Sequence, residues 1–232
     1  MKSLTCPNSE LKILVKNLFG AYTEGMWNMV SGASSYFADD RTPKAWIGRF
    51  VSPSTWNSLR TIIDQRVPWA ADNDCFTGLK REKYLTLLKR LSLLPAIDRT
   101  HLMFVTVPDV PCDHAGTLTR FRLWYNVLNW YGLPKAFVIQ NGAKDIPWDD
   151  MEALFVGGDT AWKLGMEAAR LVGEAKQRGK WVHMGRVNSI KRMRYAMSIG
   201  CDSVDGTGYS KYNRREIPKA ARVFAYTVAM PL

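Results

Sequence analysis

The sequence predicts a compact (β/α)8 barrel of the TIM type in a single domain, and three observations lead to this fold class. Short apolar runs alternate with longer amphipathic stretches from about residue 69 onward, which is typical of βαβ units and a parallel sheet. Together with an earlier strand and helix, the number of strands approaches eight. No Gly-x-Gly-x-x-Gly follows the first strand, which disfavours an open dinucleotide-binding sheet. A chain of 232 residues suits one such domain.

The expected elements alternate along the chain. Strands are expected at Trp27–Val30, Trp69–Ala71, Leu102–Val107, Ala136–Ile139, Leu154–Val156, Trp181–Met184 and Ser203–Val204. Helices are expected at Ser52–Ile63, Lys83–Leu94, Thr117–Trp130, Thr160–Arg178 and Ser189–Ile199. No role is assigned to the N-terminal segment, residues 1–26.

Local signals support several of these boundaries. Ser52 is expected to cap the first helix, with Pro53 at its first position. The helix from Lys83 has apolar residues at helical spacing on one face. Gly179 and Gly200 are expected to end the last two helices, because glycine readily adopts the left-handed conformation found after a helix.

Charge and composition limit the class of partner. The net charge is +11, with 32 Lys and Arg against 21 Asp and Glu, which favours a polyanion such as nucleic acid. No apolar run approaches the length of a membrane-spanning helix, so no membrane partner is expected. The four cysteines, Cys6, Cys75, Cys112 and Cys201, are scattered and predict neither a zinc site nor a disulfide framework. We therefore expect a reducing, cytoplasmic setting, with no metal and no cofactor.

Polar residues follow the predicted strands at their C-terminal ends. In a barrel these ends surround one mouth, where active sites of this fold lie. Two converging carboxylates would provide the nucleophile and the proton carrier that glycosidic chemistry needs. The simpler interpretation is that such residues cap helices, and Asp113 and Asp159 could do no more than that. The strand-end group comprises Asp72, Asp109, Gln140, Gly157, Gly158, Asp159, His183 and Asp205.

Five motifs in the same order resemble the queuine and archaeosine tRNA-guanine transglycosylases. The segment 182–187 followed by 200–205 is similar to that family's Met-Gly-Val-Gly turn, helix and Gly-Val-Asp-x-Phe-Asp. The segments 138–142 and 155–158 are similar to its Val-Gln-Gly-Gly and Val-Gly-Gly. Residues 71–76 are similar to its Asp-Ser-Gly-Gly-Phe, and residues 107–109 fall where the family has a base-recognising Asp.

The resemblance implies a role for each matched residue. Asp205 would be the nucleophile that attacks C1′ of a guanosine and forms a glycosyl-aspartate, and Asp72 would deprotonate the incoming base. Asp109 would accept hydrogen bonds from guanine, while Gln140 and the Gly158 N–H would donate to its O6 atom. The absence of a side chain at Gly157 and Gly158 would let the flat base approach. Phe76 and His183 complete the expected base-binding set.

The chain also departs from the tRNA enzymes of this family. It has no cluster of three Cys and one His after the barrel, and a Gly-rich segment replaces the basic Pro-Thr-Arg segment. Short zinc-less relatives of phage and bacteria insert 7-deazaguanine derivatives into DNA, which makes DNA the expected polymer, RNA the alternative and a phage origin an option. Phosphate contacts are expected from Arg186, Lys191, Arg192, Lys211 and Arg214. A solvated helix face explains any one of these charges about equally well.

Two other functions fit the same barrel. One is a base-removing N-glycosidase, in which water hydrolyses the glycosyl-aspartate. The other is a non-catalytic nucleic-acid-binding barrel, for which Asp205 would be dispensable.

Overall fold

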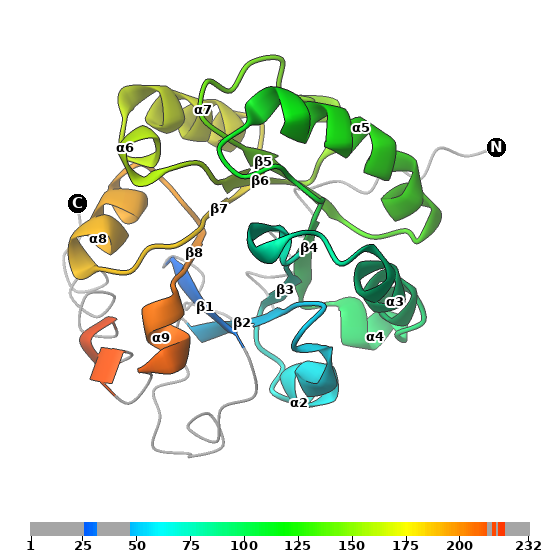
Figure 1. Ribbon diagram of the computed structural model, residues 1–232. Coiled ribbons are helices and arrows are strands. Elements are labelled where there is room, and N and C mark those ends of the chain that lie inside the picture. Colours follow the sequence, from blue (N-terminus) through cyan, green and yellow to red (C-terminus); the bar gives the residue numbers. More distant parts are fainter. Residues whose placement is uncertain (1–25, 32–46, 213–214, 217, 221–232) are drawn as a thin grey trace.

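The computed structural model describes residues 26–31, 47–212, 215–216 and 218–220. Eight parallel strands close into a barrel in chain order, and β8 pairs with β1 (Figure 1). The predicted fold class is confirmed. The strands are β1 (Trp27–Ser31), β2 (Ile47–Val51), β3 (Trp69–Ala71), β4 (Leu102–Thr106), β5 (Lys135–Ile139), β6 (Ala153–Val156), β7 (Trp181–Met184) and β8 (Ser203–Asp205).

Helices surround the barrel, as a right-handed βαβ connection requires. The longer ones, α3, α5, α7 and α8, each bury one face against the strands. The α-helices are α2 (Leu59–Asp64), α3 (Arg81–Ser92), α4 (Ala96–Arg99), α5 (His114–Trp130), α6 (Thr160–Lys163), α7 (Met166–Gln177), α8 (Ile190–Ser198) and α9 (Thr207–Lys211). Short 3-10 turns occur at η3 (Trp56–Ser58), η4 (Cys75–Thr77) and η5 (Trp148–Asp150).

Alternation along the strands divides the buried side chains into two cores. The larger core lies between strands and helices and includes Tyr84 of α3, whose hydroxyl donates to the Thr106 carbonyl. The smaller core fills the barrel interior and contains Met29, Phe50 and Phe104. Side chains on a strand alternate in direction, so a residue two positions after an inward-facing one also faces inward. A polar residue placed in this way just after a strand therefore points into the mouth of the barrel.

Two helix predictions are wrong in detail. The helix expected at 160–178 is broken into α6 and α7, because Gly165 has extended backbone angles and acts as the N-cap of α7. Ser52 does not cap a helix: its hydroxyl lies 3.0 Å from Ser54 Oγ and 3.2 Å from Thr55 Oγ1, and helical structure begins at Trp56. Strand β2 had not been expected, although its five residues are all buried.

The predicted helix ends are confirmed at both glycines. Gly179 has φ 69° and Gly200 has φ 93°, angles that glycine adopts at little cost. Among the described residues, no helix has the length and apolarity needed to cross a bilayer. The N-terminal segment lies outside the described residues, apart from Met26.

Candidate active site

A pocket of about 150 Å³ opens at the C-terminal mouth of the barrel. One ordered water needs roughly 10–15 Å³ of such volume, so the pocket has room for a small organic group. Side chains from the ends of successive strands converge on it, as expected for this fold. Its polar lining includes Asp72, Asn73, Thr106, Asp109, Gln140, Lys163, Arg186 and Asp205.

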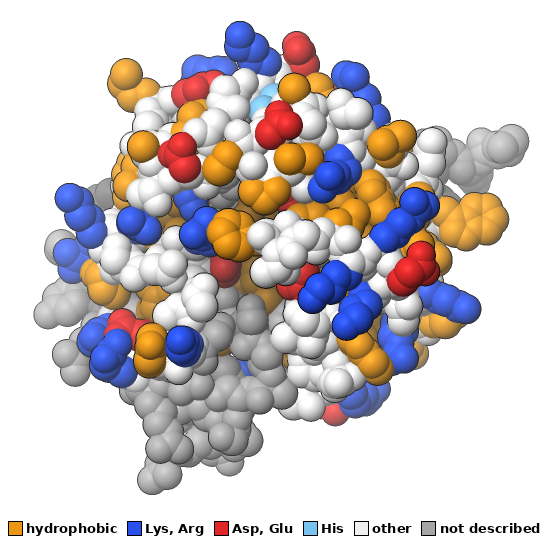
Figure 2. Space-filling view, viewed as in Figure 1, with side chains coloured by type: hydrophobic (Ala, Val, Ile, Leu, Met, Phe, Trp, Pro, Cys, Tyr) orange, Lys and Arg blue, Asp and Glu red, His pale blue; other side chains and the backbone are white. Residues whose placement is uncertain are grey.

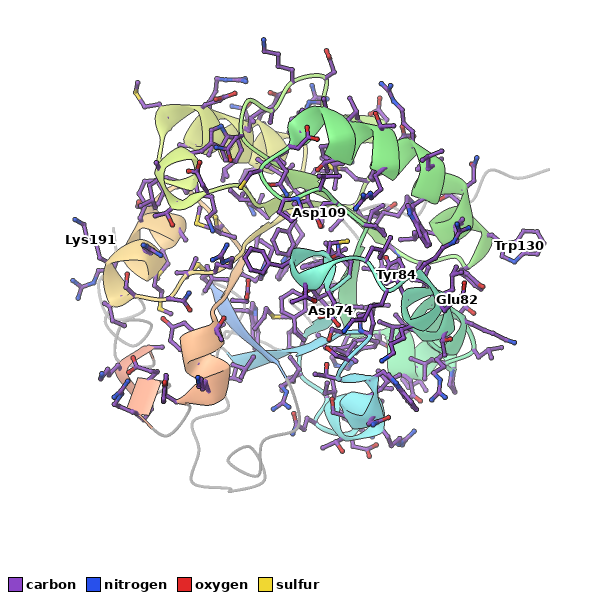
Figure 3. All side chains as sticks on the ribbon, in the orientation of Figure 1. Asp74, Glu82, Tyr84, Asp109, Trp130 and Lys191 are labelled. Carbon is purple, nitrogen blue, oxygen red and sulfur yellow. The ribbon has the colours of Figure 1, made fainter. Side chains whose placement is uncertain are left out.

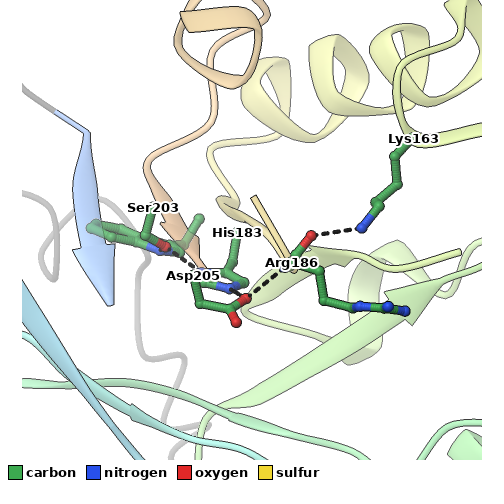
Figure 4. Close-up of polar contacts among 7 residues, drawn as sticks. Lys163, His183, Arg186, Ser203 and Asp205 are labelled. Atoms are coloured by element: carbon green, nitrogen blue, oxygen red, sulfur yellow. Dashed lines mark hydrogen bonds and ion pairs between the residues drawn. The ribbon is translucent and has the colours of Figure 1, made fainter. Parts of the chain in front are cut away.

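One oxygen of Asp205 is anchored. Oδ1 accepts a hydrogen bond from the backbone N–H of Arg186 at 3.1 Å, and His183 Nε2 lies 3.1 Å from the same oxygen (Figure 4). Oδ2 accepts no hydrogen bond from any described residue. The carboxylate is therefore held by one oxygen and presents the other to the pocket.

His183 is buried below Asp205, with none of its side chain exposed. Trp181 Nε1 donates to Ser203 Oγ at 2.9 Å, and Ser203 Oγ lies 2.8 Å from His183 Nδ1. Because a carboxylate oxygen can only accept, the contact between His183 Nε2 and Asp205 Oδ1 requires a proton on Nε2. His183 was expected to line the base pocket; the structure instead places it beneath the pocket, in contact with the carboxylate.

Asp72 follows β3 and faces the same pocket. Burial, followed by the nearby charge of Asp205, raises the pKa of Asp72 to about 7. The hydrogen bond from the Asn73 backbone opposes this shift. A carboxyl group with such a pKa can accept or release a proton near neutral pH, so Asp72 is suited to acid–base chemistry beside Asp205.

Asp109 accepts hydrogen bonds at both carboxylate oxygens. Asn73 Nδ2 donates to Oδ1 at 2.8 Å and Gln140 Nε2 donates to Oδ2 at 2.7 Å. Burial raises the pKa of Asp109, whereas these two amides favour its ionised form. Asp109 is labelled near the centre of the mouth in Figure 3. A buried acceptor fixed from both sides is suited to reading the N–H groups of a planar ligand.

Gln140 links this acceptor to the glycines after β6. Its Oε1 accepts from the backbone N–H of Gly158 at 2.7 Å and from that of Cys112 at 2.9 Å. The expected donation from the Gly158 N–H to a guanine O6 atom therefore needs correction, because Gln140 occupies that N–H. Gln140 itself retains a second proton on Nε2.

Close packing leaves no room for a side chain at either glycine. A Cβ on Gly157 would lie 2.9 Å from Gln140 Nε2, and one on Gly158 would lie 2.7 Å from Asn141 Oδ1. Gly158 also has φ 75°, a conformation that other residues rarely adopt.

Phe76 and Arg186 meet at the rim of the pocket. The Arg186 guanidinium carbon lies 4.4 Å from the centroid of the Phe76 ring, within the range of a cation–π contact. The two side chains come from opposite parts of the sequence, after β3 and after β7, and both line the pocket. Phe76 is largely exposed, so an aromatic surface is available beside the opening.

Three pocket groups had not been predicted. Asn73 positions Asp109, as described above. Thr106 Oγ1 is buried and has no hydrogen-bond partner among the described residues. Lys163 lies in the wall with 6% of its surface exposed, and its Nζ donates to the Gly185 carbonyl at 2.7 Å. The sequence did not predict Lys163 as a pocket residue, because it lies within a stretch expected to form one continuous helix.

Three of the basic residues expected to contact phosphate lie on the helices that follow β7 and β8, and Figure 3 shows Lys191 at the outer edge of the molecule. Lys191 and Arg192 belong to α8, and Lys211 ends α9. Figure 2 shows Lys and Arg side chains at many points around this face. Arg214 lies outside the described residues.

Several other acidic residues have structural roles. Asp113 accepts from Gly116 N and Asp159 from Trp162 N, so both cap helices. Asp202 pairs with Lys176 and accepts from Val182 N. Within the described ranges, no group of three or more His, Cys, Asp or Glu side chains could hold a metal ion.

No protein-family model and no curated protein matches the sequence. Solved structures resemble the fold. One is the PaMucR phosphodiesterase in complex with c-di-GMP, at 14% identity and a TM-score of 0.42, with 66% of each chain covered. Another, described as native KDPGal, has 12% identity and a TM-score of 0.48, with 88% of this chain and 96% of that chain covered. At these values neither likeness indicates an activity for this chain.

Proposed function

We propose that the protein is an enzyme that exchanges guanine in DNA for a 7-deazaguanine derivative through a covalent intermediate on Asp205. The observation that carries this proposal is the asymmetric anchoring of Asp205 opposite Asp72. Oδ1 is held by His183 and the Arg186 N–H, which leaves Oδ2 to attack C1′ of the target nucleotide. A covalent intermediate divides one difficult displacement into two easier ones.

Asp72 supplies the proton transfer. Its pKa of about 7 lets it protonate the departing guanine and then deprotonate the incoming 7-deazaguanine at the ring nitrogen that bonds to C1′. That nitrogen displaces Asp205, and two displacements retain the configuration at C1′. The hydrogen bonds to Oδ1 stabilise the carboxylate as it leaves.

Asp109 and Gln140 support a purine as the bound base. The Asp109 carboxylate would accept from the N1–H and exocyclic amine of guanine, and the second proton of Gln140 Nε2 would donate to O6. Phe76 offers a stacking surface at the rim. A base within a duplex cannot reach such a pocket, so the target must be flipped out or single-stranded.

The test is exchange of labelled guanine into DNA and into tRNA, measured side by side. The proposal expects incorporation into DNA that a 7-deazaguanine competes away. Incorporation into tRNA alone would replace the DNA assignment with the RNA alternative. Failure of the label to enter either polymer would contradict base exchange.

A base-removing N-glycosidase is the second candidate, because an ionised Asp72 could equally activate water. Release of free guanine from DNA, with no incorporation of any added base, would favour this reaction. The two activities share the same Asp205 intermediate and differ only in what displaces it.

A further inference from the structure

Lys163 is a buried amine in the wall of the pocket, and the proposed exchange does not use it. Within the described part of the chain it makes no ion pair, and its Nζ donates one hydrogen bond, to the neutral carbonyl of Gly185. Lysine side chains are seldom buried without a charged partner. One that lines a pocket is a candidate for chemistry.

Lys163 and Asp205 bind opposite ends of one peptide unit. Nζ donates to the Gly185 carbonyl at 2.7 Å, and the N–H of the same peptide, on Arg186, donates to Asp205 Oδ1 at 3.1 Å (Figure 4). Both side chains line the pocket. The amine and the carboxylate therefore lie at opposite ends of this peptide unit and border the same pocket.

The surroundings favour the neutral amine. Burial, with smaller contributions from Arg186 and Arg192, lowers the pKa of Lys163 to about 8, while Asp205 and Asp159 act in the opposite direction. A desolvated lysine near other cations is the usual form of an amine nucleophile that attacks carbonyl carbon.

We propose that Lys163 forms a Schiff base with C1′ of an abasic deoxyribose, which gives this pocket a second, lyase activity on DNA. This inference rests on the proposed function, because the carbon attacked is the one that Asp205 releases when water takes the place of a base. Its substrate class is the ring-opened sugar aldehyde in a DNA strand.

The steps balance without any external oxidant or reductant. Water adds to C1′, the C1′–Oδ2 ester bond breaks, and the proton of the water passes to Asp72. The sugar then opens to its aldehyde. The Nζ lone pair adds to C1′, and the former carbonyl oxygen leaves as water to give the C1′=Nζ imine. Loss of a C2′ proton to a carboxylate and cleavage of the C3′–O bond release the 3′ phosphate, and hydrolysis of the imine restores Lys163.

The test supplies the abasic sugar directly. A DNA oligonucleotide with one abasic deoxyribose is incubated with the protein at pH 8 and sodium borohydride, which reduces an imine to a stable amine. A covalent adduct on a denaturing gel is expected, with mass mapping that places it on Lys163. Because the neutral amine reacts and its pKa is about 8, trapping should increase from pH 6 through pH 8 and level off about one unit above the pKa.

Lys163→Arg keeps a cation and a hydrogen-bond donor at this position but removes the amine nucleophile. We expect its adduct to fall below about one hundredth of wild type, whereas Lys89→Arg, an exposed site on α3, should trap normally. Mapping of the wild-type adduct decides the question even if Lys163→Arg is poorly folded.

Absence of an adduct with wild type, or mapping to another residue, would overturn the proposal. Asp205→Asn should still trap the preformed abasic strand, since no base needs to be removed. The trapping assay therefore gives a result even if the protein does not exchange bases. A negative trapping result would in turn say nothing against base exchange.

Discussion

His183 Nε2 lies 3.1 Å from Asp205 Oδ1, and the imidazole ring is buried beneath the carboxylate that it contacts. Phe50, Phe104 and Phe155 surround this ring, with centroids 5.1, 5.5 and 4.6 Å away. The aromatic packing holds the imidazole, and Ser203 Oγ contacts its Nδ1. The core of the barrel thus fixes the orientation of the Asp205 carboxylate.

Replacing His183 by Ala should lower kcat more than it raises KM. Loss of one hydrogen bond to a charged group costs about 1.5–3 kcal/mol, or roughly 10- to 100-fold in rate. His183→Gln, which retains an N–H donor, should recover part of kcat. Steady-state kinetics of guanine exchange measures both, and an unchanged kcat in the Ala variant would show that the contact is structural only.

Asp72 should make stability depend on pH in an unusual direction. Its pKa is near 3.8 in an unfolded chain and about 7 in the folded protein, so folding binds a proton between these values. The stabilising contribution is complete below about pH 4 and is lost as the pH rises through 7. Asp72→Asn should therefore raise the free energy of unfolding at pH 8, by at most a few kcal/mol, and change it little at pH 4. Urea unfolding at both pH values tests this, and equal effects would contradict the assigned pKa.

Activity should also follow the ionisation of Asp72. The second step requires the carboxylate form to deprotonate the incoming base, so its rate should fall as the pH drops through the pKa of Asp72. Single-turnover transfer from the preformed glycosyl-enzyme isolates this step. In that state Asp205 is esterified and no longer adds its charge to the effect of burial, so the pKa of Asp72 should lie below the value of about 7 in the free protein. A rate that is constant from pH 4 to 8 would exclude Asp72 as the base of this step.

Asp109→Asn should impair recognition of the guanine exocyclic amine. Removing one acceptor for a substrate N–H costs about 1–3 kcal/mol, so KM for guanine should rise roughly 5- to 150-fold. KM for hypoxanthine, which lacks the amine, should rise less. Asp113→Asn is the matched control: it alters a helix cap 3.0 Å from Gly116 N and should leave both KM values unchanged.

Lys191 and Lys211 should contribute to DNA affinity through phosphate contacts. Each Ala variant is expected to weaken binding similarly for all sequences and to reduce the slope of log Kd against log salt by about 1. Lys89→Ala, at the exposed end of α3, provides the control. A wild-type slope in both variants would favour a merely solvated surface.

The strand-end positions of Asp72, Asp109, Gln140 and Asp205 followed from the sequence because a strand directs alternate side chains to one side. Other features depend on three-dimensional packing. Gly48 and Arg49 interrupt the apolar run of β2, so the sequence did not predict this strand, although all five of its residues are buried in the barrel. In the sequence Lys163 lies within one predicted long helix. In the structure the helix breaks between α6 and α7, and the amine of Lys163 reaches the Gly185 carbonyl after β7, in the wall of the pocket.

The most direct test of the central claim is covalent capture of DNA by Asp205. Wild-type protein is incubated with guanine-containing single-stranded DNA, denatured and run on a gel, with the adduct mapped by mass spectrometry. The account predicts a DNA adduct on Asp205 that disappears in Asp205→Asn and is released when a 7-deazaguanine is added. An adduct that persists in Asp205→Asn, or base exchange with no adduct on Asp205, would contradict it.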